Sequence, residues 1–250
     1  MRWMDLAIGT RWSAPPLHPR AIPGVVDVWR ADLGAKPGGL GELEGLLCAQ
    51  ERERAARIVR ARDRMLWARS RGMLRALLGR YVDRDPRELA LELGAHGKPA
   101  LGDDDGHASD LRFNLSHSGG MMLVAVTAGR EVGVDVEVVR DPARRTLDER
   151  AIAARVLGAE QARRLERLEP RERTREFQRA WTMREAAVKC LGTGLASAPV
   201  AGEGGGGSGG RIAALWTTEL DAGPRAAAAV AVEGSEACES RCWDWWDWAG

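Results

Sequence analysis

Three extended segments follow one another between residues 111 and 140, and they limit the fold more than any other feature of the sequence. They read LRFNLSHSGG, MMLVAVTAGR and EVGVDVEVVR, and each contains apolar or β-branched runs bounded by polar or glycine residues. Such runs indicate buried strands. The turn signal from Ala128 to Arg130 predicts that the second and third segments are strands joined as a hairpin. The chain is therefore expected to contain a central β-sheet.

The third segment places two carboxylates on one face of its strand. Side chains alternate along a strand, so the valines from Val132 to Val138 point one way, while Gly133, Asp135 and Glu137 point the other way. Carboxylates two residues apart on one face repel each other, and a divalent cation bound between them removes that repulsion. A solvated face of a hairpin gives the same sequence pattern. Both interpretations are open at this point.

The stretch from Phe177 to Leu195 predicts a long helix that ends at the following glycines. Its expected apolar side consists of Phe177, Ala180, Trp181, Ala187, Val188 and Leu191. Glu185 and Lys189 lie four residues apart at the border of this side, so they can act on one bound group. Arg184 falls within the apolar side, where a cation needs an anion. The set indicates a ligand of mixed charge, such as a metal with phosphates, although a solvated salt pair is the simpler alternative for Glu185 and Lys189.

A helical region from Glu51 to Arg80 carries ten arginines against three acidic residues, a local surplus of seven positive charges. Leucine and methionine side chains supply its apolar side, so most of the arginines line solvated faces. Arginine also suits phosphate recognition because its planar guanidinium presents a fork of donors. We select Arg52, Arg54 and Arg69 as candidates for holding a nucleotide phosphate.

Two short polar stretches are further candidates for ligand contacts. In GAHGKPAL, Gly97 and Pro99 fix an irregular backbone around Lys98, which presents a cation to a ligand. Ser116 and His117 precede two glycines, in a turn that can offer hydroxyl, amide and imidazole groups to an anion. A histidine that satisfies its own turn is the simpler alternative.

Composition excludes several classes of protein. A net charge of +1 over 250 residues excludes a generally basic polymer-coating protein, so we expect no nucleic-acid partner. The longest apolar run, Met121 to Ala128, is much shorter than a membrane span, and the first residues lack the pattern of a secretion signal. We therefore expect a cytoplasmic protein without a membrane partner. Cys48, Cys190, Cys238 and Cys242 fit neither a disulfide framework nor a zinc site, and reduced thiols are expected.

The chain is expected to consist of two halves. The acidic, glycine-bearing stretch from Gly102 to Asp110 indicates an exposed loop, and we place there the boundary between residues 1–110 and 111–250. Further strands are expected near Val25–Trp29, Leu89–Leu93, 211–220 and 226–232, and helices at 146–157 and 158–168. The glycine-rich run 201–210 indicates a flexible loop. The tryptophan-rich end either packs back on the surface or forms an exposed patch for a partner.

Four motifs together resemble the 4′-phosphopantetheinyl transferases, in particular their larger, surfactin-synthetase type. They are GKP at 97–99, FNLSHS at 113–118, VGVDVE at 132–137 and WTMREAAVK at 181–189. They occur in the order and at the approximate spacing of that family, over about residues 47 to 195. The resemblance implies an α/β (α+β) fold of two pseudo-twofold related halves, with coenzyme A bound between them. It also implies a monomer.

The resemblance implies a role for each motif residue. Asp135, Glu137 and Glu185 would hold Mg²⁺ against the pyrophosphate, and Lys189 would steady charge at the reacting phosphate. Lys98, Ser116 and His117 would contact coenzyme A, as would Arg184, although the family usually has lysine at that position. The arginine-rich helices match the region that holds the 3′-phosphate, but their basic positions do not align cleanly.

The implied reaction transfers 4′-phosphopantetheine from coenzyme A to a serine of an apo acyl or peptidyl carrier protein and releases 3′,5′-ADP. Asp135, Glu185 and Lys189 would be the catalytic residues, with Glu185 as the base that accepts the serine proton. A noncatalytic module that binds coenzyme A or a carrier protein is the alternative from another class, and a nucleotide phosphatase lacks a recognisable second metal set. The intact acidic trio with Lys189 favours the transferase.

Overall fold

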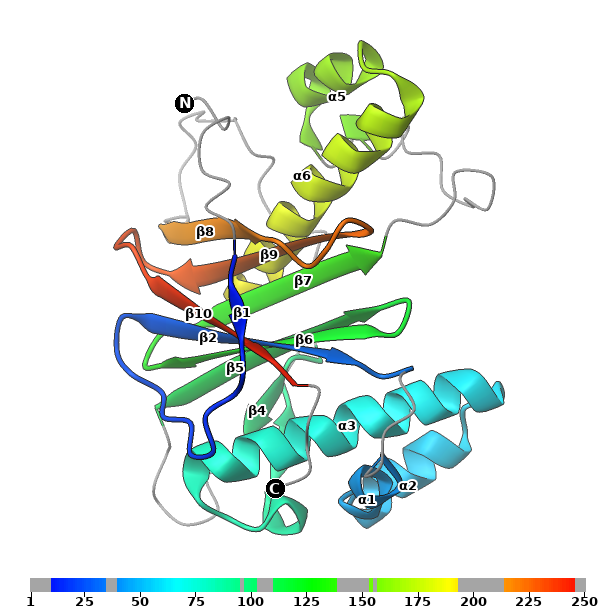
Figure 1. The fold of residues 1–250 in the computed structure, drawn as a ribbon, viewed down its shortest axis with the longest axis vertical. Helices are drawn as coiled ribbons and strands as arrows, with labels where there is room; N and C mark the ends of the chain where they lie inside the picture. The colour runs from blue at the N-terminus through cyan, green and yellow to red at the C-terminus, as the bar shows by residue number, and fades with distance from the viewer. Residues whose placement is uncertain are drawn as a thin grey trace.

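Two β-sheets packed face to face lie between two long helices in the computed structural model (Figure 1). It describes residues 10–34, 40–94, 97–102, 110–138, 153–154, 157–192 and 214–245. Helix α3 (Ala61–Val82) covers the outer face of one sheet, and helix α6 (Pro170–Leu191) covers the outer face of the other. This mixed α/β architecture agrees with the predicted fold class.

The first sheet has the strand order β1-β10-β2-β6-β5. Its strands are β1 (Trp12–Ser13), β10 (Glu239–Asp244), β2 (Val25–Asp32), β6 (Met121–Ala128) and β5 (Leu111–Ser118). Strands β5 and β6 form a hairpin through Gly119 and Gly120, which both have positive φ. One face packs against Leu74, Leu77 and Leu78 of α3, and the other face packs against the second sheet.

The second sheet has the order β7-β9-β8, and all its pairs are antiparallel. It consists of β7 (Val132–Val138), β9 (Ala226–Glu233) and β8 (Leu215–Leu220), so the strands expected near 211–220 and 226–232 are confirmed. The expected hairpin between the second and third central segments is wrong, because β7 pairs with β9 and not with β6. Both edges of β6 are already paired, with β2 and with β5, so β7 must join another sheet.

Shorter helices and a small sheet complete the described fold. Helices α1 (Leu40–Gly45) and α2 (Ala49–Ala56) pack beside α3, and α5 (Ala159–Glu166) packs beside the first half of α6. Strands β3 (Leu91–Leu93) and β4 (Pro99–Leu101) form a hairpin of their own. The strand predicted from Leu89 begins later, because a 3-10 turn at Pro86–Glu88 precedes it and Leu89 is buried in the core.

The tryptophan-rich end forms strand β10 inside the first sheet, between β1 and β2. Trp243 and Trp245 lie against Trp29 of β2, with ring centroids 6.2 and 5.7 Å away. The buried Asp27 carboxylate accepts hydrogen bonds from Arg241, Trp243 and Tyr81. The described part of the tail therefore belongs to the core of the sheet, rather than to an exposed patch.

Some predictions lie partly or wholly outside the described residues. These are most of the helix at 146–157, the loop at 201–210, and Trp246 and Trp248. The proposed division at residue 110 stays a prediction, but strands from both sides of it share the first sheet. Among the described residues, no helix is long and apolar enough to span a membrane.

Candidate active site

Side chains of β5 join the two sheets where the edge of β7 meets β5. Asn114 Oδ1 accepts a hydrogen bond from the Val134 amide at 2.9 Å. The Ser116 hydroxyl accepts one from the Val136 amide at 3.4 Å, and the Ser118 hydroxyl accepts one from the Val138 amide at 3.2 Å. Because these residues alternate with the core residues Leu111 and Phe113, they all point toward β7. The polar positions of FNLSHS thus satisfy backbone groups that a neighbouring strand would otherwise pair.

Asp135, Ser116 and Lys189 form a hydrogen-bonded cluster at this seam. The Lys189 ammonium lies 2.6 Å from Asp135 Oδ1 and 3.0 Å from Ser116 Oγ, and Ser116 donates to the same Asp135 oxygen at 2.8 Å. Asp135 is only 3% exposed, so a solvated carboxylate face is excluded at this position. Strands β5 and β7 and helix α6 therefore each contribute one polar side chain to this cluster.

Glu185 and Glu137 extend this cluster into an acidic site. Burial, followed by the Asp135 charge, raises the pKa of Glu185, while the nearby Lys189 and Arg184 charges lower it and Glu137 raises it. Glu137 accepts a hydrogen bond from Ser118 at 2.9 Å. The Glu185 carboxylate is therefore close enough to the two acids of β7 to be affected by their charges.

Two buried carboxylate oxygens of this site, Asp135 Oδ2 and Glu185 Oε1, have no hydrogen-bond partner. Buried oxygens without donors fit a bound cation, and carboxylates are the hard ligands that Mg²⁺ prefers. Within the described part of the chain, no three carboxylate, imidazole or thiol groups are already gathered around one metal position. The carboxylate oxygens thus have the chemistry that a divalent cation needs, but they do not already surround one point. The Lys189 ammonium lies against Asp135, one of the expected ligands.

Close contact between α6 and β7 positions Glu185 and Lys189. A Cβ atom on Gly133 would lie 2.0 Å from the Ala186 carbonyl oxygen, so the helix backbone rests directly on the strand. The most buried line of α6 near the sheet is Thr182, Ala186 and Cys190. The apolar side predicted from the helical wheel is therefore partly wrong, because Ala187 and Leu191 are only half-buried and the contact requires small side chains. The predicted helix end is confirmed, with Leu191 last and Gly192 in the left-handed conformation.

An open cavity of about 410 Å³ connects this site with the arginine-rich helices. Glu185, Lys189 and His117 line one part, and Arg54, Trp67 and Arg71 line another. Leu93, Pro99, Leu115 and Val188 add apolar surface. The guanidinium carbons of Arg54 and Arg71 lie 5.6 and 5.7 Å from the centroid of the Trp67 ring. This combination suits a ligand with both anionic and apolar parts.

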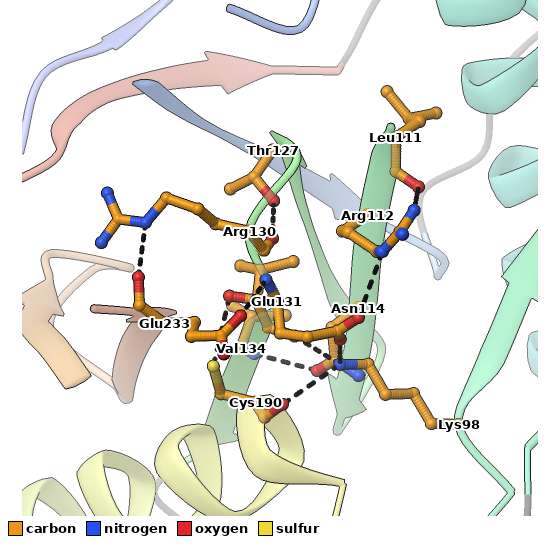
Figure 2. A network of polar contacts seen from close by, with 11 residues as sticks. Lys98, Leu111, Arg112, Asn114, Thr127, Arg130, Glu131, Val134, Cys190 and Glu233 are labelled. Carbon is orange, nitrogen blue, oxygen red and sulfur yellow. Dashed lines mark hydrogen bonds and ion pairs between the residues drawn. The ribbon is translucent and has the colours of Figure 1, made fainter. Parts of the chain in front are cut away.

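Lys98 and His117 line the cavity, but their polar atoms differ in what they can offer. The Lys98 ammonium lies 2.6 Å from Glu131 Oε2, 3.0 Å from the Val132 oxygen and 3.5 Å from the Cys190 oxygen (Figure 2). Desolvation and then the Lys189 charge lower the pKa of His117. A neutral imidazole can hold an anion through a hydrogen bond, without adding a charge.

The arginines selected from the sequence occupy different places. Arg54 lines the cavity, whereas Arg52 bonds the Leu47 carbonyl and Arg69 bonds the Leu33 carbonyl at 2.9 Å, both away from the cavity lining. Arg184 is half-buried, and its charge acts on Glu185.

Sequence reasoning missed Arg71, Trp67 and the Asn114 contact. The spacing of Trp67 and Arg71, one helical turn apart, was the available signal for the first two residues. The alternation along β5 was the signal for Asn114.

Comparisons with known proteins point to one family. A family model described as 4′-phosphopantetheinyl transferase, N-terminal, matches residues 42–129, and one described as 4′-phosphopantetheinyl transferase superfamily matches residues 131–202. The 4′-phosphopantetheinyl transferase HetI of Nostoc sp. is 32% identical over 185 residues, which cover 74% of this chain and 76% of that protein.

Two further relatives match shorter stretches. The 4′-phosphopantetheinyl transferase of Bacillus subtilis is 26% identical over 163 residues, 64% of this chain and 68% of that protein. The human L-aminoadipate-semialdehyde dehydrogenase-phosphopantetheinyl transferase is 26% identical over 149 residues, 58% of this chain and 48% of that protein. The two family models span the residues that meet at the seam, with Ser116 in the first matched stretch and Asp135 and Lys189 in the second. On these comparisons, the chain belongs to the 4′-phosphopantetheinyl transferase superfamily.

Proposed function

We propose that this protein transfers the 4′-phosphopantetheine group of coenzyme A to a serine of an apo acyl or peptidyl carrier protein and releases 3′,5′-ADP. The observation that carries the proposal is the meeting of Glu185, Lys189 and Asp135 beside a cavity whose other part is basic and aromatic. Family membership supports the same activity. The protein's monomeric state and cytoplasmic location stay predictions.

Coenzyme A supplies the charges and apolar groups that the cavity suits. Its phosphates are anionic, and Arg54 and Arg71 beside Trp67 offer guanidinium groups to them. Glu51 lies 3.2 Å from Arg71 and holds this guanidinium in place. The apolar wall formed by Leu115 and Val188 suits the pantetheine arm. In this proposal Arg52 and Arg69 contribute to the positive field and not to direct contacts.

Asp135, Glu137 and Glu185 are the residues that we propose to hold Mg²⁺. Two of their oxygens are buried without a hydrogen-bond partner. Burial and then the Asp135 charge raise the pKa of Glu185, and a cation beside these carboxylates would oppose both effects. A magnesium ion bound there would reduce the charge on the pyrophosphate oxygens and polarise the phosphoryl group under attack.

The reaction requires movement of one proton and stabilisation of charge. The carrier serine oxygen forms a bond to the β-phosphorus of coenzyme A, the bond from that phosphorus to the leaving 3′,5′-ADP breaks, and the serine proton is lost. Glu185 is the proposed acceptor of this proton, directly or through a water, because its carboxylate lines the cavity beside Lys189. Lys189 lines the same cavity and stabilises negative charge on the phosphoryl oxygens.

The proposal is tested by incubating the purified protein with coenzyme A, Mg²⁺ and several apo carrier proteins, then measuring the intact mass of each carrier. We expect a gain of one phosphopantetheine mass and an equal amount of 3′,5′-ADP. Asp135→Ala should abolish both products. If no carrier gains mass while an established transferase modifies the same carriers, the proposal is wrong, and calorimetric binding of coenzyme A would then favour the noncatalytic binding module.

A further inference from the structure

Lys98 and Glu131 form a contact between the β3–β4 hairpin, β7 and the end of α6. Lys98 precedes β4, and Glu131 immediately precedes β7. An ammonium has three N–H donors, and the Lys98 ammonium has three acceptors: Glu131 Oε2 at 2.6 Å, the Val132 oxygen at 3.0 Å and, at a longer 3.5 Å, the Cys190 oxygen. In this arrangement, each donor of Lys98 therefore points toward a protein acceptor.

The contact to Cys190 fixes the last turn of α6 from two directions. Its carbonyl belongs to the helix C-terminus, where backbone oxygens lack helical partners and the helix dipole favours a cation. Its thiol donates to the Glu131 carbonyl oxygen at 3.3 Å. Figure 2 shows Cys190 of α6 facing both Glu131 and Lys98. Cys190 is only 2% exposed, so little room is left for this turn to shift.

The last turn of α6 also carries the proposed catalytic lysine. Lys189 precedes Cys190 in the chain and reaches Asp135 Oδ1 at 2.6 Å. Gly133 lies against the backbone of this turn, at the Cys190 nitrogen. A shift of the turn along β7 would therefore move the Lys189 ammonium relative to Asp135. Displacements of about 1 Å in a reacting centre can cost roughly 100-fold in rate.

We propose that Glu131 is a positioning residue, whose carboxylate holds the Lys98 ammonium against the Cys190 carbonyl and thereby fixes the last turn of α6 and Lys189. Arg112 also contacts Glu131, with its Nε 3.2 Å from Oε1, so the carboxylate joins β5 to the same point. The resemblance implies a different role for Lys98, direct contact with coenzyme A. The two roles predict different effects of removing Glu131.

The experiment compares Glu131→Ala, Glu131→Gln, Lys98→Met and the control Glu219→Gln. The control removes the negative charge from the Arg179–Glu219 pair at 2.6 Å, which joins α6 to β8 in the earlier part of the helix, so it matches Glu131→Gln. For Glu131→Ala we expect a fall in kcat of roughly 10-fold or more, with KM for coenzyme A unchanged within about twofold. Glu131→Gln keeps a hydrogen-bond acceptor and should recover part of the loss. The control Glu219→Gln should have the kcat and the KM for coenzyme A of the wild type.

Two further measurements do not depend on transfer activity. Hydrogen exchange of the amides at the end of α6 should become faster in Glu131→Ala and Lys98→Met, and it should not change in the control. Calorimetric affinity for coenzyme A should be unchanged within about twofold in Glu131→Ala, because Glu131 does not line the cavity. Glu131 has 43% of its side chain exposed, so we expect both of its variants to fold.

The kcat measurement rests on the proposed function. If the wild-type protein shows no transfer, the hydrogen exchange of α6 and the calorimetric affinity for coenzyme A still test the role of Glu131. Unchanged exchange in Glu131→Ala would overturn the inference. So would a loss of coenzyme A affinity of roughly 10-fold in Lys98→Met with tighter binding in Glu131→Ala, since Lys98 would then be a ligand that Glu131 restrains.

Discussion

Replacing Gly133 by alanine tests whether the contact between α6 and β7 sets the geometry of the candidate site. An alanine Cβ would lie 2.0 Å from the Ala186 oxygen and 2.3 Å from the Cys190 nitrogen. Both are backbone atoms, so no side chain can rotate away. To restore ordinary contact at 3.4 Å, the helix must move by about 1.4 Å in that direction.

Two losses of different size should follow from this displacement. Overpacking of this kind costs roughly 1–3 kcal/mol of stability. A movement of this size also carries Glu185 and Lys189 away from Asp135, so the rate of carrier modification should fall by roughly 100-fold. The expected result is a folded protein that is moderately destabilised and nearly inactive.

The assay measures urea unfolding and initial rates of carrier modification for Gly133→Ala and for Gly45→Ala. Gly45 ends α1, and nothing lies within 4 Å of a Cβ added there, so this control should keep the stability and rate of the wild type. A Gly133→Ala protein with a wild-type rate would refute the reasoning, because the active geometry would then tolerate displacement of the helix.

Three further predictions concern the core, the seam and the cavity. Burial and then the Asp27 charge raise the pKa of Tyr81, the single tyrosine of the chain, above its ordinary value of about 10. Because folding raises this pKa, the stability that Tyr81 contributes is complete below about pH 10 and is lost as pH rises further. Phenolate absorbance should therefore appear only together with unfolding, and ionisation of Tyr81 in the folded protein at pH 10 would contradict this. Asn114→Ala should lower the free energy of unfolding by roughly 1–3 kcal/mol, because the Val134 amide loses its acceptor, and a change below about 0.5 kcal/mol in urea unfolding would be too small. Arg71→Gln should raise KM for coenzyme A by roughly 10-fold, whereas the same change at Arg60, which is exposed outside the cavity lining, should not; equal effects would count against a phosphate contact at Arg71.

The sequence predicted the parts of the site that depend on strict periodicity. Alternation along a strand put Asp135 and Glu137 on the face opposite three buried valines, which have exposed fractions of 1% or less. The contact between Asp135 and Lys189 was not part of that prediction. The helix end at Gly192 followed from a glycine that tolerates the left-handed conformation. These features depend on residues close together in the chain, so they can be predicted from a single sequence.

Other features depend on partners that are distant along the chain. The helical wheel ranked residues by apolarity, but α6 meets β7 through small residues such as Thr182 and Ala186, because the close approach at Gly133 leaves no room for larger ones. The partner of β7 depended on whether the edges of β6 were occupied. Strand β10 was missed because its pairing partner, β2, lies more than 200 residues earlier.

Among the arginines, residue type alone could not separate a cavity wall from a backbone contact. Arg54 and Arg71 line the cavity because they lie beside Trp67, whereas Arg52 and Arg69 turn to backbone carbonyls. The direction of a long side chain depends on which surfaces its helix packs against. That information requires the tertiary structure.

The central claim is that Asp135, Glu137 and Glu185 form, with Lys189, the centre where the phosphoryl group reacts. Its most direct test is the rate of carrier modification by Glu185→Gln at saturating coenzyme A, compared with wild-type protein with and without a chelator of divalent cations. We predict a loss of at least about 100-fold in the variant, which should still bind coenzyme A, and a loss in the chelated wild type that Mg²⁺ reverses. Wild-type rates in the variant, or in the presence of excess chelator, would contradict the claim.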